Sequence, residues 1–299
     1  MGMLSSDLGR ELGHVFAEAA RHGATKAAPP NFGEPPMVVV DRPMSELTVG
    51  LLVSLGARGP NQRPLRTTND LTFNPIAQSV PTAQIDFDHP SPIRYWADRD
   101  LNVAFPRDRL AELAADGTIG SLAPTTISML GSITLWDQLA TETAPRIKAE
   151  FDAQGVDVVV VVPFCPGCHR AMMILARALE GRGMPTLTLS TLADTSEAFK
   201  PPRTALLDYP PGSPCGRVGD PAHQRDTLRA ALSVPLNVAT RQVFPVPVTY
   251  QVDGKNDWMQ QTQQLYRDGE KVVLDDAIAH GKTESLAGQE EQFAIRCAC

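Results

Sequence analysis

The chain has 299 residues, of which 42% are hydrophobic, and it carries a formal net charge of −7. This composition is sufficient for a sizeable core and excludes wholesale disorder. No basic block is interleaved with aromatic residues, so we expect no nucleic-acid partner, and the longest apolar run is far shorter than the ~20 residues of a membrane span. Charged residues interrupt positions 1–21, unlike the apolar stretch of a signal peptide, which indicates a cytoplasmic protein whose thiols stay reduced.

The first half of the chain contains few regular elements. Residues 5–22 are expected to form an amphipathic helix, and the proline-rich residues 26–36 a linker. Residues 47–55 have the composition of a buried strand, whereas residues 69–99 are irregular and rich in Asp, Pro and His. Pro106 is expected to open a helix, because proline is tolerated in the first helical turn.

The second half alternates between helices and strands. Residues 133–154 are expected to be helical, and residues 156–162 are mostly valine without polar alternation, which is typical of a strand covered on both faces. A helix at 168–182 and a strand at 185–190 complete a βαβ unit, and a further strand follows at 204–208.

This pattern predicts an α/β fold with a mostly parallel sheet or sheets and flanking helices, arranged as two Rossmann-like lobes with a cleft between them. The strands at 47–55 and 156–162 are expected at the centres of separate lobes. The expected segments are an N-terminal helix and linker at 1–36, a first α/β lobe at 37–140, a second α/β lobe with a Cys-x-x-Cys site at 141–245, and a C-terminal segment and tail at 246–299.

A Cys-x-x-Cys pair is the most informative motif. Cys165-Pro166-Gly167-Cys168-His169 follows the valine-rich strand and opens the next helix, where the helix N-terminus favours a thiolate. This position predicts a reactive thiolate at Cys165, with Cys168 resolving it into a disulfide. The opposite order, with Cys168 as the more activated thiol, stays open.

Four other interpretations apply to the same motif. Cys-x-x-Cys-His is also a haem attachment pattern, although haem attachment normally follows export. Zinc or iron is a stronger alternative, with Cys165, Cys168 and either His169 or the tail cysteines as ligands. The interpretation as a reactive dithiol requires no cofactor. A thioredoxin-like domain would leave the upstream half of the chain unexplained. Two buried cysteines can also pack simply as small apolar residues.

Further candidates are scattered along the chain. His89 is a candidate proton donor, metal ligand or substrate-binding residue, and Ser128 a candidate substrate-binding residue. Cys215 follows a strand, and we expect either that it faces the same cleft or that it is an ordinary loop cysteine. Cys297 and Cys299 form a Cys-x-Cys at the C-terminus, either a redox tail that exchanges electrons with the buried pair or an incidental feature.

Several segments in a fixed order resemble the selenoprotein B family of glycine, sarcosine, betaine and D-proline reductases, in a form with Cys in place of selenocysteine. The resemblance covers about residues 45–245, and its order is fairly specific although no single motif is diagnostic. The segments are 98–106, 108–110, 120–124, 128–131, 142–145, 155–157, 165–169, 201–203 and 208–224.

The resemblance implies a function and a set of partners. It places Cys165 on the selenocysteine position of the family's motif and Cys168 on the cysteine that accompanies it. In those enzymes the selenocysteine helps to cleave a carbon–nitrogen bond reductively. Electrons come from thioredoxin-type dithiols, and other subunits carry the group that activates the carbonyl. Segment 125–128 departs from relatives, which often have a His before the Ser.

We therefore expect a thiol-dependent reductase of a small substrate, reduced by a dithiol protein such as thioredoxin. The chain is expected to act as a homo-oligomer or as a subunit of a reductase complex. His169 or His89 would donate a proton to the leaving group.

Overall fold

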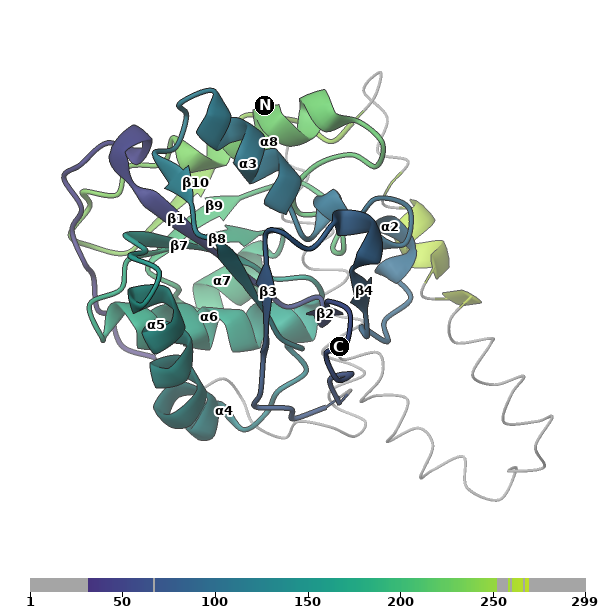
Figure 1. Ribbon diagram of the computed structural model, residues 1–299, viewed down its shortest axis with the longest axis horizontal. Helices are drawn as coiled ribbons and strands as arrows, with labels where there is room; N and C mark the ends of the chain where they lie inside the picture. The colour runs from purple at the N-terminus through teal and green to yellow at the C-terminus, as the bar shows by residue number, and fades with distance from the viewer. Residues whose placement is uncertain (1–31, 67, 252–257, 259, 266, 269–299) are drawn as a thin grey trace.

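The computed structural model describes residues 32–66, 68–251, 258, 260–265 and 267–268. Within them, eight strands form one sheet with helices on both faces, and two short strands, β2 and β4, pair separately (Figure 1). The predicted α/β fold with a mostly parallel sheet is confirmed. The expected helix at 5–22 and the tail residues Cys297 and Cys299 lie outside the described residues.

The strands of the large sheet lie in the order β10-β9-β8-β7-β1-β6-β3, and β5 pairs with β1 beside β6. Every neighbouring pair is parallel except β3 and β6. The strands are β1 (Thr48–Val53), β2 (Ala57–Arg58), β3 (Asn74–Ala77), β4 (Asp86–Phe87), β5 (Ser121–Leu122), β6 (Thr125–Ser128), β7 (Val158–Val162), β8 (Thr186–Ser190), β9 (Arg203–Leu206) and β10 (Gln242–Pro245).

The two strands expected in separate lobes are direct neighbours. β1 and β7 pair in register from Val49 opposite Val158 to Val53 opposite Val162. Both strands are apolar along their length, so both of their faces need cover, and each needs a strand on either side. The arrangement in two lobes with a cleft between them is therefore not confirmed.

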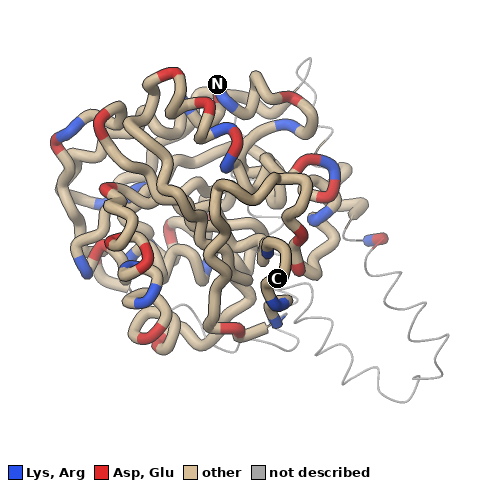
Figure 2. The backbone as a smooth tube through the Cα atoms, in the orientation of Figure 1, with Lys and Arg blue, Asp and Glu red and all other residues tan. Residues whose placement is uncertain are grey.

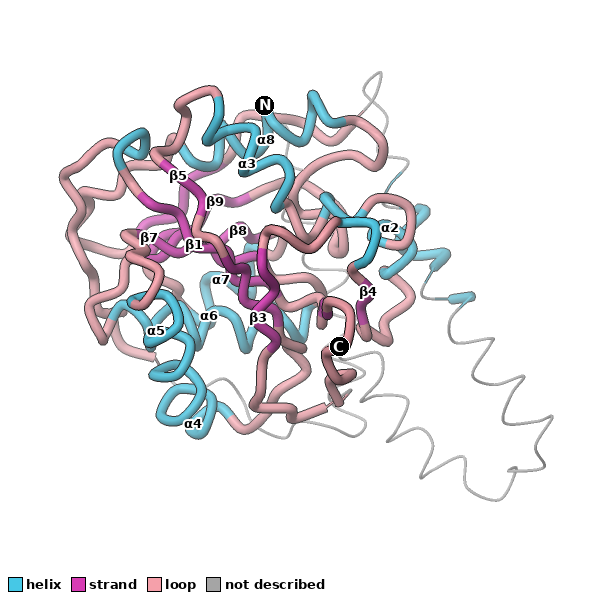
Figure 3. The backbone as a smooth tube through the Cα atoms, viewed as in Figure 1, coloured by secondary structure: helices cyan, strands magenta, loops and turns pink. Residues whose placement is uncertain are grey.

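Helices cover both faces of the sheet, with α3 and α8 on one face and α5, α6 and α7 on the other (Figure 3). Successive valines of β7 alternate between these two layers. The helices are α2 (Arg94–Ala97), α3 (Arg107–Ala115), α4 (Trp136–Gln138), α5 (Ala144–Asp152), α6 (Pro166–Glu180), α7 (Ala193–Phe199) and α8 (Pro221–Leu232), with 3-10 turns η2 (Met44–Glu46), η3 (Thr82–Gln84) and η4 (Leu101–Val103) and a π-helical turn η5 (Leu139–Thr143).

Charged residues of both signs lie around the periphery, and the strands at the centre of the sheet are uncharged (Figure 2). Among the described residues, no helix combines the length and the apolar character that crossing a bilayer requires.

The parallel strands bring several loops to one edge of the sheet. The carboxyl ends of β1, β7 and β8 lie side by side, because these strands pair in parallel order. In open α/β sheets ligands bind at this edge. The Cys-x-x-Cys motif follows β7 there and opens α6, as the sequence predicts.

Candidate functional site

The dithiol sits at the start of α6. Cys165 is the N-cap residue, with extended backbone dihedral angles, and Pro166 is the first residue of the helix. The sulfur of Cys165 accepts a hydrogen bond from the amide N–H of Cys168, at 3.2 Å between N and Sγ. Cys165 thus takes the role that Ser or Asp usually plays at a helix start, and its sulfur receives one N–H group of the first turn, which favours negative charge.

The two sulfurs are close but not bonded. Sγ of Cys165 and Sγ of Cys168 are 3.0 Å apart, whereas a disulfide bond is about 2.05 Å long. Both side chains are 0% exposed. A separation this short suits a thiol that donates its hydrogen to a thiolate, and it needs only a small shift to become a disulfide.

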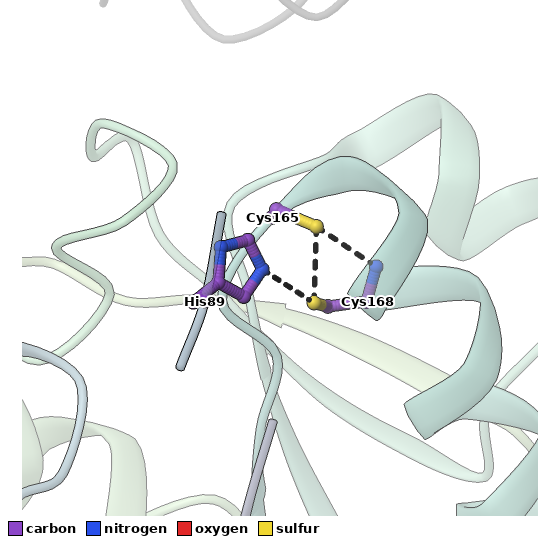
Figure 4. Close-up of side chains that lie close together, drawn as sticks. All are labelled: His89, Cys165 and Cys168. Atoms are coloured by element: carbon purple, nitrogen blue, oxygen red, sulfur yellow. Dashed lines mark hydrogen bonds between the residues drawn. The ribbon is translucent and has the colours of Figure 1, made fainter. Parts of the chain in front are cut away.

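His89 faces the two sulfurs from the side opposite α6 (Figure 4). It lies between β4 and α2, is fully buried, and places Nε2 3.3 Å from Sγ of Cys168. The amide of Ser91 donates to Nδ1, at 3.2 Å. Nδ1 therefore carries no proton in this arrangement, and Nε2 carries the hydrogen that points at the sulfur. His89 is a hydrogen-bond donor to a Cys168 thiolate.

Two further residues enclose Cys168. Its sulfur lies 3.6 Å from the carbonyl oxygen of Ser54, the residue that follows β1, and the Ser54 hydroxyl accepts a hydrogen bond from the amide of Phe164. Gly131 packs so closely that a Cβ there would lie 2.6 Å from Cα of Cys168. No motif in the sequence marks Ser54 as part of the site. Its position just after a buried strand was the available signal.

The environment favours a thiolate in this pair. Burial alone would raise the pKa of Cys168, but the hydrogen bond from Cys165 and the adjacent His89 outweigh burial and hold that pKa well below the usual value of a cysteine. One negative charge is thus shared by two sulfurs, with hydrogen bonds from an imidazole and a helix N-terminus.

His169, a sequence candidate, points elsewhere. Its Nδ1 lies 2.8 Å from the carbonyl oxygen of Cys165, and its Nε2 accepts a hydrogen bond from the amide of Thr191 at 3.2 Å. Burial lowers its pKa to about 4, against the opposing effect of the hydrogen bond to the Cys165 carbonyl. The ring is therefore neutral at physiological pH, with Nδ1 bound to the backbone of the motif and Nε2 to the backbone just after β8.

Two other candidates form hydrogen bonds with residues other than the thiols. Cys215 is buried, its amide donates to the carbonyl of Val103, and burial raises the pKa of its thiol. Ser128 ends β6, and its hydroxyl accepts a hydrogen bond from the amide of Ala57 at 2.7 Å. Cys215 does not belong to the group of converging His, Cys, Asp and Glu ligand atoms that is found among the described residues.

Three potential metal ligands converge at the site. One ligand atom each from His89, Cys165 and Cys168 lies within 4.8 Å of the other two. The histidine of this group is His89, not His169. Tetrahedral zinc with bonds of about 2.3 Å to sulfur separates two thiolates by roughly 3.8 Å, so the 3.0 Å pair would have to open to bind it.

Comparisons with known proteins show what this chain is similar to. No protein-family model matches the chain, and no solved structure matches it significantly. It is 26% identical over 215 residues to D-proline reductase subunit gamma of Acetoanaerobium sticklandii, covering 71% of this chain and 88% of that protein. It is 27% identical over 140 residues to glycine reductase complex component B subunit gamma of Carboxydothermus hydrogenoformans, covering 46% of this chain and 31% of that protein. These matches confirm that the chain resembles the selenoprotein B family of glycine and D-proline reductases.

Proposed function

We propose that this chain is the dithiol subunit of a reductase complex that cleaves a carbon–nitrogen or related carbon–heteroatom bond in a small substrate. The observation that carries this proposal is the pair of sulfurs 3.0 Å apart at the start of α6, beside His89. The relatives support it, because both are named as gamma subunits of reductases. The relatives' substrates, D-proline and glycine, are the first to test.

The proposed reaction exchanges bonds in two steps. The sulfur of Cys165 attacks the substrate carbon, so a C–S bond forms as the carbon–heteroatom bond breaks, and the thiol proton passes to Cys168. Cys168 then attacks the Cys165 sulfur, so an S–S bond forms as the C–S bond breaks. The substrate gains two electrons and two protons, and the dithiol becomes a disulfide.

The protons and electrons of this cycle have defined sources. The thiol proton ends on the substrate carbon, and His89 passes a second proton from water to the departing heteroatom. A dithiol protein of the thioredoxin type then reduces the disulfide and restores the pair. Activation of the substrate carbon is assigned to a partner subunit, as the resemblance implies.

A single turnover without reductant tests the proposal. With the partner subunits and substrate present, each molecule of product should yield one Cys165–Cys168 disulfide, detected by peptide mass spectrometry. Cys165→Ser should abolish product, and Cys168→Ser should stop at a substrate adduct on Cys165. Cys215 should remain an unmodified thiol throughout and serves as an internal reference. Product without the disulfide, or full turnover by Cys165→Ser, would rule out the mechanism.

A metal site is the second candidate function, favoured by the convergence of His89, Cys165 and Cys168. We propose zinc or iron as the metal in this alternative, since both accept thiolate and imidazole ligands. Elemental analysis of protein purified without chelators distinguishes the two candidates. Stoichiometric metal that is lost in both His89→Ala and Cys168→Ser would support the metal site, and metal-free protein with intact dithiol chemistry would exclude it.

A further inference from the structure

Ser54 ends the regular hydrogen bonding between the two central strands. β1 and β7 pair in parallel up to Val53 opposite Val162, and the amide of Ser54 donates to the carbonyl of Val162 at 3.3 Å. In a regular parallel ladder the carbonyl of Ser54 would accept the next hydrogen bond, from the amide of Phe164. That amide donates instead to the Ser54 hydroxyl, at 2.9 Å. The side chain of Ser54 thus takes the place of its own carbonyl in the ladder.

The carbonyl of Ser54 bonds to the dithiol instead. Its oxygen lies 3.6 Å from Sγ of Cys168, in a geometry in which the thiol donates and the carbonyl accepts. Both residues are 0% exposed, so the contact is shielded from bulk solvent. Because a carbonyl oxygen only accepts hydrogen bonds, it stabilises the protonated form of Cys168 and repels the thiolate.

Cys168 therefore has a hydrogen-bond partner in each of its protonation states. As a thiolate it accepts from Nε2 of His89, at 3.3 Å, and from the thiol of Cys165, at 3.0 Å between the sulfurs. As a thiol it donates to the carbonyl of Ser54. When Cys168 takes the proton that lies between the two sulfurs, this carbonyl binds the new S–H group and the negative charge remains on Cys165.

We propose that Ser54 is a positioning residue for the proton of the dithiol: it keeps a backbone carbonyl free for the S–H group of Cys168 and thereby favours the state in which Cys165 carries the charge. The inference rests on the proposed reductase function, whose first step transfers this proton from Cys165 to Cys168. The hydroxyl of Ser54 acts through Phe164, because it occupies the amide that would otherwise bind the carbonyl.

Replacing Ser54 by Ala tests this role without removing any atom of the dithiol. The amide of Phe164 should then bond to the carbonyl of residue 54 and extend the pairing of β1 with β7, so this carbonyl is no longer free for Cys168. Limited alkylation by iodoacetamide reports where the charge lies, because the attacking thiolate forms a C–S bond as iodide leaves. Peptide mass spectrometry gives the ratio of alkylated Cys165 to alkylated Cys168.

This ratio should fall about threefold in Ser54→Ala, in line with the net effect of one neutral hydrogen bond. Ser54→Thr retains the hydroxyl and should keep the ratio of the wild type. Ser196→Ala is the matched control, because it removes another fully buried hydroxyl, whose hydrogen bonds lie around the start of α7, and it should leave the ratio unchanged. An unchanged ratio in Ser54→Ala would overturn the proposal. An equal change in both alkylation rates would also do so, since it means that only the opening of the site has changed.

A second measurement uses the wild-type chain. Isotopic labelling of serine carbonyl carbons and leucine amide nitrogens selects the NMR signals of Ser–Leu peptide bonds, which the sequence contains at 54–55, 121–122 and 285–286. The signal of the 54–55 bond is assigned by its loss in Ser54→Ala. It should move with pH at the midpoint of thiol ionisation, because the carbonyl loses an S–H partner and faces a thiolate.

The signal of the 121–122 bond is the internal reference and should not move, because Ser121 is exposed on β5. A stationary signal of the 54–55 bond in the wild type would overturn the contact between the Ser54 carbonyl and the dithiol. Failure of the reductase proposal would instead appear as turnover without the disulfide.

Discussion

Nε2 of His89 lies 3.3 Å from Sγ of Cys168, although the two residues are 79 positions apart in the sequence. The imidazole is held by the Ser91 amide on its other nitrogen and by edge contact with the Phe164 ring, whose centroid is 4.5 Å away. This fixed orientation directs one N–H at the thiolate. His89, rather than His169, therefore has the geometry of a proton donor to the dithiol.

Replacing His89 by Phe should raise the pKa of the reactive thiol. The lost hydrogen bond to a charged group is worth about 1.5–3 kcal/mol, which corresponds to about one to two pKa units. Alkylation by iodoacetamide as a function of pH measures this shift, and the midpoint should move upward. His89→Gln retains an N–H donor and should show a smaller shift. An unchanged midpoint in His89→Phe would exclude a role for His89 in stabilising the thiolate.

His169 should make stability depend on pH. Its pKa falls from 6.5 to about 4 on folding, so between these values the unfolded chain binds a proton that the folded chain does not. The neutral ring therefore contributes stability that is fully present above about pH 6.5 and is lost as the pH falls toward 4, up to roughly 3 kcal/mol. Urea unfolding across this pH range measures the slope. His169→Gln should flatten it, and an identical slope in that variant would contradict the assignment.

Gly131→Ala should disturb the dithiol directly. Its Cβ would lie 2.6 Å from Cα and 2.9 Å from Sγ of Cys168, so the backbone must move. We expect a loss of about 1–3 kcal/mol in unfolding free energy, typical of overpacking, together with altered iodoacetamide reactivity of Cys168. Gly33→Ala is the matched control, because a Cβ there meets nothing within 4 Å. Equal unfolding free energies of the two variants would show that the loop around Gly131 can move to accommodate the Cβ without loss of stability.

The buried ion pair between Glu180 and Arg203 should be asymmetric in its effects. Both side chains are 0% exposed, and burial raises the pKa of Glu180 while Arg203 opposes that change. Arg203→Met leaves a buried carboxylate without its cation and should cost about 3–5 kcal/mol of unfolding free energy. Adding Glu180→Gln should recover most of this loss, which chemical denaturation can measure.

An exposed ion pair provides the comparison for that prediction. Lys148 and Asp152 are four residues apart on α5 and partly or fully solvated, so Lys148→Met should change the unfolding free energy by less than about 1 kcal/mol. A loss in Arg203→Met no larger than the loss in Lys148→Met would mean that water or relaxation compensates the buried charge.

The sequence predicted the second half of the fold well. A valine-rich run, a helix that starts at the Cys pair and a following strand correspond to β7, α6 and β8, with boundaries that differ by at most two residues. These elements have strong local signals, namely β-branched composition, Pro at the helix start and Gly after the helix end. The unbroken apolar pattern of β7 also indicated correctly that both of its faces are covered.

The first half could not be predicted to the same extent. β3 contains a proline at the edge of the sheet, and β5 has two residues, so neither has a usable periodicity. The contact between His89 and Cys168 depends on how an irregular segment packs against the end of β7. No spacing in the sequence encodes that contact. The same holds for Gly131, whose role depends on the closeness of a helix 37 residues further along the chain.

Because Cys165 and Cys168 are completely enclosed, the size of a reagent decides whether it can reach either sulfur. Neither sulfur has exposed surface, so any reaction requires neighbouring segments to part for a moment. Dissolved oxygen and small electrophiles can enter during brief openings, whereas glutathione disulfide needs a much wider one. The pair should therefore resist adventitious glutathionylation, and the reducing protein should compete for the same rare openings as the substrate.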